Sequence, residues 1–341
     1  MPEVYENAAF FESLGDVADM LADLWYVDAA KPYLQDLPWN VMYDNIFEVP
    51  LGKRHPFHVR ISVNDEEWPR VQHQLRSYEG EAAAKAESAA QDLAGGASTL
   101  TGFDPGSHRE TVAQLGRIHD LLARDGHKDL GLLERYLDDW AGTAADTFAD
   151  NFYQPLELTH ANQCYLLGEM AKAASNAVGI VEAAQDSLMN AVRAASDVLD
   201  QQLAQRARGS GGSSSTEFLT VTTATVGLVN TLKYATTPTA AALGLASVGA
   251  TLVREYGISN AGVKPATIRA SSADDVAESL RGEVSGAGTW MDRSLSALNG
   301  TVGAKRTEMS NMEDDDRLSA ARPALTPDTP RQGFHYQFGD L

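Results

Sequence analysis

The fold is decided by the stretch WAGTAADTF, which occupies residues 140–148. Helix-forming sequence lies on both sides of it, and Gly142 permits a sharp reversal of the backbone. Thr143 is a candidate cap for the second helix, and the alanines that follow it allow close helix contact. Phe148 lies far enough beyond the glycine to pack back beside the Trp140 indole. The stretch therefore predicts a corner between two antiparallel helices, centred on Trp140, Gly142 and Phe148.

The arm that follows the turn carries the longest periodic pattern in the sequence. Apolar or small residues recur at alternating spacings of three and four, at Leu167, Met170, Ala174, Ala177, Val181, Ala184, Leu188, Ala191, Ala195 and Val198. This heptad spacing keeps one stripe of a helix facing one partner. Five of these positions are alanine, so the partner helix must approach closely. We therefore predict a long helix that belongs to a helical bundle.

Helical periodicity extends outward from the hairpin in both directions. It predicts further helices over residues 5–28, 65–94, 109–124, 129–140 and 273–312. The helix over 65–94 has Asp65 as a candidate cap and ends at Gly95-Gly96, which places a loop over 97–108. Prolines and glycines interrupt residues 37–63, where the strand-like run FHVRISV indicates an irregular excursion with a small hairpin.

Composition changes abruptly after the long helix. A Gly/Ser-rich linker covers 207–216, and the apolar stretch 217–256 beyond it is divided by polar residues and proline into pieces shorter than the roughly 20 residues that span a bilayer. Two buried small-residue helices are the favoured interpretation of this stretch. The predicted organisation is an N-terminal helical region (1–108), the hairpin (109–206), the linker (207–216), a small-residue-rich helical region (217–322) and a flexible tail (323–341). The predicted fold class is all-α, an elongated helical bundle with a central WxG hairpin and a flexible C-terminal tail.

Charge restricts the classes of partner. The 341 residues include 47 acidic and 27 basic side chains, for a formal net charge of −20. Nucleic acids and anionic membrane surfaces are bound through clustered lysine and arginine, so this balance argues against both. The N-terminal sequence has neither the basic segment nor the apolar segment of a cleaved signal peptide.

Catalytic and metal-binding motifs are missing from the sequence. It contains no HExxH, GxSxG or GxxxxGK[ST], and its eight histidines are scattered. The acidic run at 313–316 lacks the alternation and the glycine of a calcium loop. Cys164, the single cysteine, lies in a helical pattern and is interpreted as a small buried residue. We expect no catalytic residues, no metal and no cofactor, and we classify the chain as a non-enzyme.

The stretch at 140–148 resembles the WxG turn of the WXG superfamily of type VII (ESX) secretion substrates, and the longer chain resembles PE/PPE-type secreted proteins. The resemblance covers roughly residues 109–206, and an ordinary helix corner that happens to contain Trp and Gly fits the same letters. It implies a helical hairpin that pairs with another helical protein and is exported without a cleaved signal. This chain departs from typical members because some 100 residues precede the hairpin.

The resemblance also implies an export signal of the form Tyr-x-x-x-Asp/Glu beyond the second helix. Tyr336 and Asp340 fit that spacing at the C-terminus, and we favour them because an exposed tail is accessible to a translocase. Tyr153 and Glu157 also fit, but they directly follow the turn and enclose Pro155.

Two functional hypotheses follow from these patterns. The first is a secreted or secretion-associated structural and interaction protein of a type VII system, which self-associates or binds a helical partner and contacts the secretion machinery. The second is a membrane-active or toxin-delivery protein that uses 217–256 as an insertion segment. We expect secretion without a cleaved signal peptide, with the cytoplasm as the alternative location, and no binding to nucleic acid.

Overall fold

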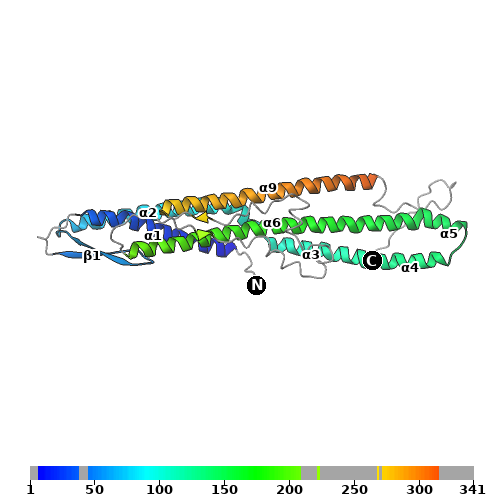
Figure 1. Cartoon of the computed structure of the whole chain (residues 1–341), viewed down its shortest axis with the longest axis horizontal. Coiled ribbons are helices and arrows are strands. Elements are labelled where there is room, and N and C mark those ends of the chain that lie inside the picture. Colours follow the sequence, from blue (N-terminus) through cyan, green and yellow to red (C-terminus); the bar gives the residue numbers. More distant parts are fainter. Residues whose placement is uncertain (1–6, 38–44, 209–220, 223–266, 269–270, 315–341) are drawn as a thin grey trace, which may run out of the picture. The chain divides into compact units, whose positions relative to one another are not determined.

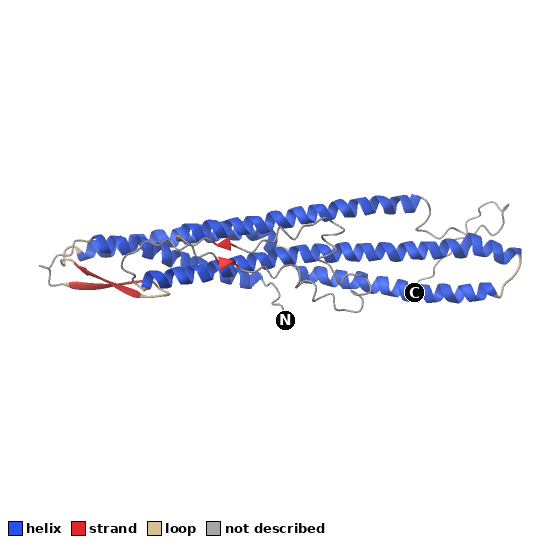
Figure 2. Cartoon of the chain, in the orientation of Figure 1, coloured by secondary structure: helices blue, strands red, loops and turns tan. Residues whose placement is uncertain are grey.

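The computed structural model describes residues 7–37, 45–208, 221–222, 267–268 and 271–314, and this part of the chain is all-α, as predicted (Figure 1). The helices are α1 (Asn7–Asp36), α2 (Trp68–Thr101), α3 (Pro105–Leu121), α4 (His127–Asp138), α5 (Thr143–Phe148), α6 (Gln154–Ala207) and α9 (Ala273–Asp314), with π-helical turns η1 (Leu122–Gly126) and η2 (Ala149–Tyr153). The strands, red in Figure 2, form two antiparallel pairs: β1 (Ile46–Leu51) with β2 (Phe57–Ser62), and β3 (Val221–Thr222) with β4 (Thr267–Ile268).

Contacts divide the chain into two units. Among the described residues, unit 1 contains 7–37, 45–105, 178–208, 221–222, 267–268 and 271–296. Unit 2 contains 106–177 and 297–314. Helices α6 and α9 each contribute residues to both units. Each unit is described separately below.

The core of unit 1 is built from α1, α2, the second part of α6 and the first part of α9. The apolar positions of α1 that predicted the helix are all buried: Leu14, Val17, Leu21 and Leu24. The heptad positions of α6 in this unit are buried as well: Val181, Ala184, Leu188, Ala191, Ala195 and Val198. The periodicity therefore identified the buried faces of α1 and of this part of α6 correctly.

The irregular excursion contains the small hairpin that its strand-like run predicted. Strands β1 and β2 pair antiparallel from Ile46 opposite Ser62 to Leu51 opposite Phe57. The inward-facing side chains of both strands join a core with the end of α1 and the start of α2. Phe47 stacks on Trp68 with ring centroids 4.3 Å apart, which fixes the hairpin against α2.

The predicted boundaries of α2 are wrong at both ends. Its N-terminal flanking residue is Glu67, whereas the Asp65 carboxylate accepts a hydrogen bond from the Asn45 amide. The helix also continues through Gly95-Gly96 to Thr101, and α3 begins at Pro105, so most of the predicted loop is helical. Gly96 is a packing residue, because a Cβ built on it would lie 3.3 Å from the Val284 Cγ1 atom of α9.

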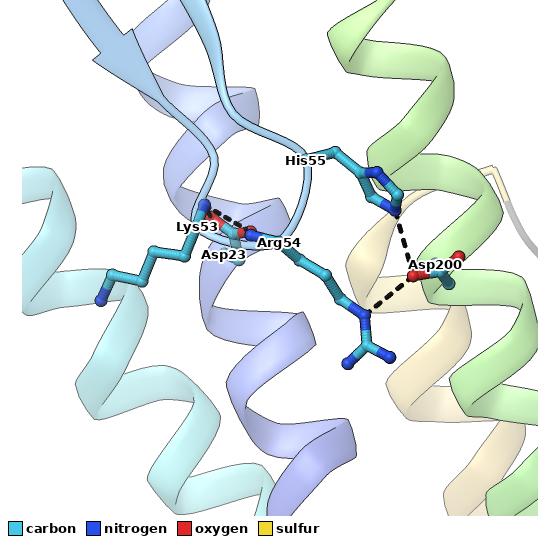
Figure 3. A network of polar contacts seen from close by, with 5 residues as sticks. All are labelled: Asp23, Lys53, Arg54, His55 and Asp200. Atoms are coloured by element: carbon cyan, nitrogen blue, oxygen red, sulfur yellow. Dashed lines mark hydrogen bonds and ion pairs between the residues drawn. The ribbon is translucent and has the colours of Figure 1, made fainter.

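The loop between β1 and β2 fastens two helices of unit 1 through a polar network. The buried Asp23 carboxylate on α1 accepts hydrogen bonds from the backbone N–H groups of Lys53 and Arg54, at 2.9 to 3.1 Å. Figure 3 shows the side chains of Arg54 and His55 reaching Asp200 on α6, with nitrogen–oxygen distances of 2.8 and 3.1 Å. These hydrogen bonds, first that of His55 and then that of Arg54, lower the pKa of Asp200. The network has a structural role that the sequence did not reveal.

Several predicted features lie outside the described residues. These are residues 209–216 of the linker, the stretch 217–256 apart from Val221–Thr222, and the tail 323–341 with Tyr336 and Asp340. At Val221–Thr222 the prediction of helix is wrong, because these residues form strand β3 by pairing with β4. In the ranges that are described, no helix is both long enough and apolar enough to cross a membrane. Helix α9 begins as predicted, because the Ser272 hydroxyl accepts a hydrogen bond from the Asp275 backbone N–H.

Candidate interaction surface of the Trp-Ala-Gly hairpin

The turn of unit 2 is built around Gly142. Helix α4 ends at Asp138, and Gly142 has φ 107° and ψ 174°, a backbone conformation that side chains with a Cβ avoid. Helix α5 begins immediately afterwards, since the Ala145 and Asp146 backbone N–H groups donate to the Gly142 carbonyl. The predicted cap at Thr143 is wrong. Thr143 is the first residue of α5, and no side chain caps the Gly142 end of the helix.

The two arms of the hairpin run antiparallel on either side of this turn (Figure 1). The Nε2 atom of His160 lies 2.8 Å from the Leu122 carbonyl oxygen. Further from the turn on both arms, a Cβ on Gly168 would meet the His119 ring at 3.8 Å. Residues progressively more distant from Gly142 therefore face one another across the arms.

A π-helical turn in the first arm accommodates the histidine. The predicted helices 109–124 and 129–140 leave a gap around Gly126, and this gap is wrong: Gly126 has φ −61° and ψ −42° and lies inside η1, which joins α3 to α4 without a break. A Cβ on Gly126 would overlap the His160 imidazole. The glycine therefore provides space for a side chain of the opposite arm, and His160 contacts the carbonyl of Leu122 within the π-turn.

Aromatic side chains gather at the turn end of the hairpin. The Trp140 and Phe148 ring centroids are 5.7 Å apart, so Phe148 packs beside the indole as predicted. Phe148 also contacts Phe152 at 5.0 Å. Trp140 remains 47% exposed and Tyr136 remains 75% exposed. The end of the hairpin thus carries aromatic rings that pack against one another, and two of its rings, Trp140 and Tyr136, are exposed to solvent.

The arms leave many large apolar side chains in solvent. The exposed ones in residues 106–177 are Ile118, Leu121, Leu132, Tyr136, Trp140, Leu158, Tyr165 and Met170. The buried apolar side chains in the same range are Leu130, Ala145 and Ala171. Met170 shows the contrast along α6, because this heptad position is 49% exposed whereas the positions from Val181 onward are buried.

The second part of α9 contacts one of these side chains, Tyr165. The Lys305 ammonium group donates a hydrogen bond to the Tyr165 hydroxyl, lies 5.2 Å from the centre of its ring and pairs with Glu308. The hydrogen bond to Tyr165, followed by that to Glu308, raises the pKa of Lys305. The contact holds α9 on α6 within unit 2.

Carboxylates from both arms converge near Tyr153, the last residue of η2. Burial of the phenol, followed by the negative charges of Glu134, Glu157 and Asp138, raises the pKa of Tyr153. Tyr153 and Glu157, the less favoured candidate signal, therefore lie close together at the turn end. The sequence alone does not reveal this convergence. The i, i+4 spacing of Glu134 and Asp138 was the available signal, but it does not show that the two arms meet there.

Cys164 and His160 form a loose pair on one face of α6. Their sulfur and Nε2 atoms are 3.7 Å apart, and burial raises the pKa of the Cys164 thiol, which disfavours the reactive thiolate. Within the described ranges, no group of three or more His, Cys, Asp or Glu side chains is arranged to hold a metal ion. The arrangement offers contact surface, with apolar arms and an acidic aromatic end. Comparison with protein-family models, curated proteins and solved structures finds no match to this chain.

Proposed function

We propose that this protein is a structural and interaction component of a type VII secretion system, exported without a cleaved signal peptide. It associates through its helices with a second copy or with a helical partner protein. The proposal assigns it no catalytic activity, cofactor or metal. The single observation that carries it is the exposed apolar surface on both arms of the hairpin.

The exposure has a direct energetic consequence. Burying apolar surface is favourable by about 25 cal/mol per Å². The arms leave Leu121, Leu132 and Leu158 in water, so a partner that covered them would gain this free energy. A second pair of helices laid against the arms would cover such side chains in a four-helix arrangement.

The secretion class is supported by the resemblance of WAGTAADTF to the WxG turn and by the geometry at Gly142 that suits such a turn. Tyr336 and Asp340 remain our favoured export signal, with Tyr153 and Glu157 as the second candidate. The test compares culture supernatants of native cells with those of an isogenic strain that lacks the type VII ATPase. We expect the protein only in the supernatant of the native cells.

Two variants separate the candidate signals. Tyr336→Ala should abolish export if the tail signal acts, whereas Tyr153→Ala should abolish it if the hairpin signal acts. Absence of the unmodified protein from the native supernatant, with the protein abundant in the cells, would refute the secretion class.

Association is tested by native mass. We expect the purified chain to exceed the monomer mass of 36.6 kDa, alone or after addition of its partner. Replacing Leu132 and Leu158 by glutamate should restore the monomer mass. The control substitutions Glu12→Gln and Glu66→Gln, at two exposed positions of unit 1, should leave the mass unchanged. A chain that stays monomeric at all concentrations and binds no co-purified helical protein would contradict the proposal.

A further inference from the structure

We propose that the turn end of the hairpin is a docking surface for a cationic segment of a partner protein, one that presents lysine or arginine beside apolar side chains. This inference rests on the proposed function, because it names the chemistry of the partner at the same hairpin. The surface, called here the acidic aromatic end, consists of Tyr136, Trp140, Tyr153 and the carboxylates of residues 134–157.

The aromatic rings supply the contact area. Tyr136 and Trp140 are the two most exposed aromatic side chains of the hairpin, at 75% and 47%. The Trp140 indole packs against the Phe148 ring, which packs in turn against the Phe152 ring. A supported, exposed ring costs little side-chain entropy on binding, and its face attracts a lysine or arginine cation.

The charge around these rings has one sign. Residues 134–157 contain six carboxylates and one cation, Arg135, whose Nε atom donates to the backbone carbonyl of Gly131. The negative charges of Glu134 and Asp138 on the first arm and of Glu157 on the second act on the Tyr153 phenol and, after its burial, raise its pKa. A positive side chain placed at this point would interact with carboxylates from both arms at once.

Within the described ranges, Glu134 and Glu157 also differ from several other carboxylates of unit 2, because those form ion pairs. Asp125, Glu169 and Glu308 each form an ion pair with a neighbouring arginine or lysine. Among the described residues, neither Glu134 nor Glu157 forms a hydrogen bond or an ion pair through its side chain. These two carboxylates can therefore pair with a cation that a partner supplies.

Charge complementarity selects the occupant. A second copy would present the same net negative charge to this end, and like charges brought together oppose association. An anionic membrane is repelled for the same reason. A segment with lysine or arginine flanked by apolar side chains satisfies both the carboxylates and the exposed rings.

The experiment measures binding of a fluorescent amphipathic helical peptide of leucine and lysine to the full chain, by anisotropy. A matched peptide with glutamate in place of lysine, and vesicles of neutral phosphatidylcholine, are the comparison probes. We expect binding of the lysine peptide alone. We also expect it to weaken by about tenfold when the salt concentration rises from about 0.05 to about 0.5 M.

Matched variants locate the surface. The triple variant E134Q, D138N and E157Q should weaken binding by about tenfold or more, and Tyr136→Ala should weaken it several-fold. The control triple variant replaces three exposed carboxylates of unit 1, E12Q, E66Q and E278Q, and should bind as the unmodified chain does. Circular dichroism of every variant verifies that the helices are intact.

Three outcomes would overturn the inference. The two triple variants could lose equal affinity for the lysine peptide, the glutamate peptide or the neutral vesicles could bind as tightly as the lysine peptide, or the lysine peptide could fail to bind. The assay involves neither export nor self-association. A protein that is exported but ignores the lysine peptide would therefore refute the docking surface alone, and one that binds the peptide but is never exported would refute the secretion class alone.

Discussion

At the scale of single residues, Gly142 carries the strictest conformational demand in the hairpin. Its φ of 107° lies in a region that glycine occupies readily and other residues do not. No atom lies within 4 Å of a Cβ built there, so the constraint comes from the backbone and not from packing. The turn therefore depends on this glycine for its geometry, while the aromatic rings beside it determine its surface.

Gly142→Ala should destabilise the hairpin by about 1 to 3 kcal/mol, because alanine must adopt the strained conformation. The measurement is urea unfolding followed by circular dichroism. Gly131→Ala is the matched control, since Gly131 lies inside α4 with free space around its Cβ position and should gain up to about 1 kcal/mol of helix stability. Equal effects of the two substitutions would show that the turn does not require a left-handed residue.

Asp200 provides a pH-dependent contribution to unit 1. His55 and then Arg54 lower the pKa of its carboxylate below the ordinary value of 3.8, so its contribution to folding is fully present above that pH and disappears as the pH falls through the lowered pKa. Asp200→Asn should reduce the free energy of unfolding at pH 7 by less than about 1 kcal/mol, since the network is partly exposed. The difference between variant and unmodified chain should narrow below pH 4. A difference that is constant from pH 7 to pH 3 would contradict this assignment.

At the scale of elements, helix α2 shows how tertiary contacts override local signals. Gly95-Gly96 has the composition of a helix end, yet α2 passes through it because Gly96 lies against α9. The side-chain amide of Gln185 donates hydrogen bonds to the backbone carbonyls of Leu100 and Phe103. It thereby supplies donors to backbone acceptors at the corner between α2 and α3. Both partners come from distant parts of the chain.

Gly96→Leu should lower the free energy of unfolding by about 1 to 3 kcal/mol, because the side chain has to enter the contact with Val284. Gly95→Leu is the control, because nothing lies within 4 Å of its Cβ position and leucine favours a helix. Thermal unfolding of both variants separates the two effects. If Gly96→Leu is neutral, the α2–α9 contact is looser than the Cβ distance indicates.

The sequence could predict whatever depends on local periodicity. The buried faces of α1 and of the second part of α6, the β-hairpin in the excursion, and the pairing of Trp140 with Phe148 all follow from spacing within a short window. The ends of α2, the π-turn that receives His160 and the carboxylates gathered near Tyr153 could not be predicted in this way. Each of them depends on residues from a second segment whose position is set only by the fold.

At the scale of the whole molecule, protection of the backbone should follow burial. Residues 178–207 of α6 pack into the core of unit 1, whereas residues 154–177 leave Leu158 and Met170 exposed. We expect amide hydrogen exchange to be slower in the former segment, by at least tenfold, because its opening disrupts more apolar contact. Exchange mass spectrometry measures this. Addition of a partner should slow exchange in 154–177, and uniform exchange along α6 would show that the arms are already covered.

Unit 1 is closed by contacts between residues that lie far apart in the sequence. This has a consequence for the order of folding. Asp28 meets Arg206 across 178 positions, and Asp92 meets Arg281 across 189, so the core that holds α1 and α2 is completed only after α9 has been synthesised. The hairpin arms, by contrast, are neighbours in the chain and close a short loop around Gly142. Because closing a long loop costs more entropy than closing a short one, the hairpin should form first. During synthesis the chain thus acquires its exposed contact surface before it acquires its main core, and an early partner at the hairpin would meet a protein that is still being completed.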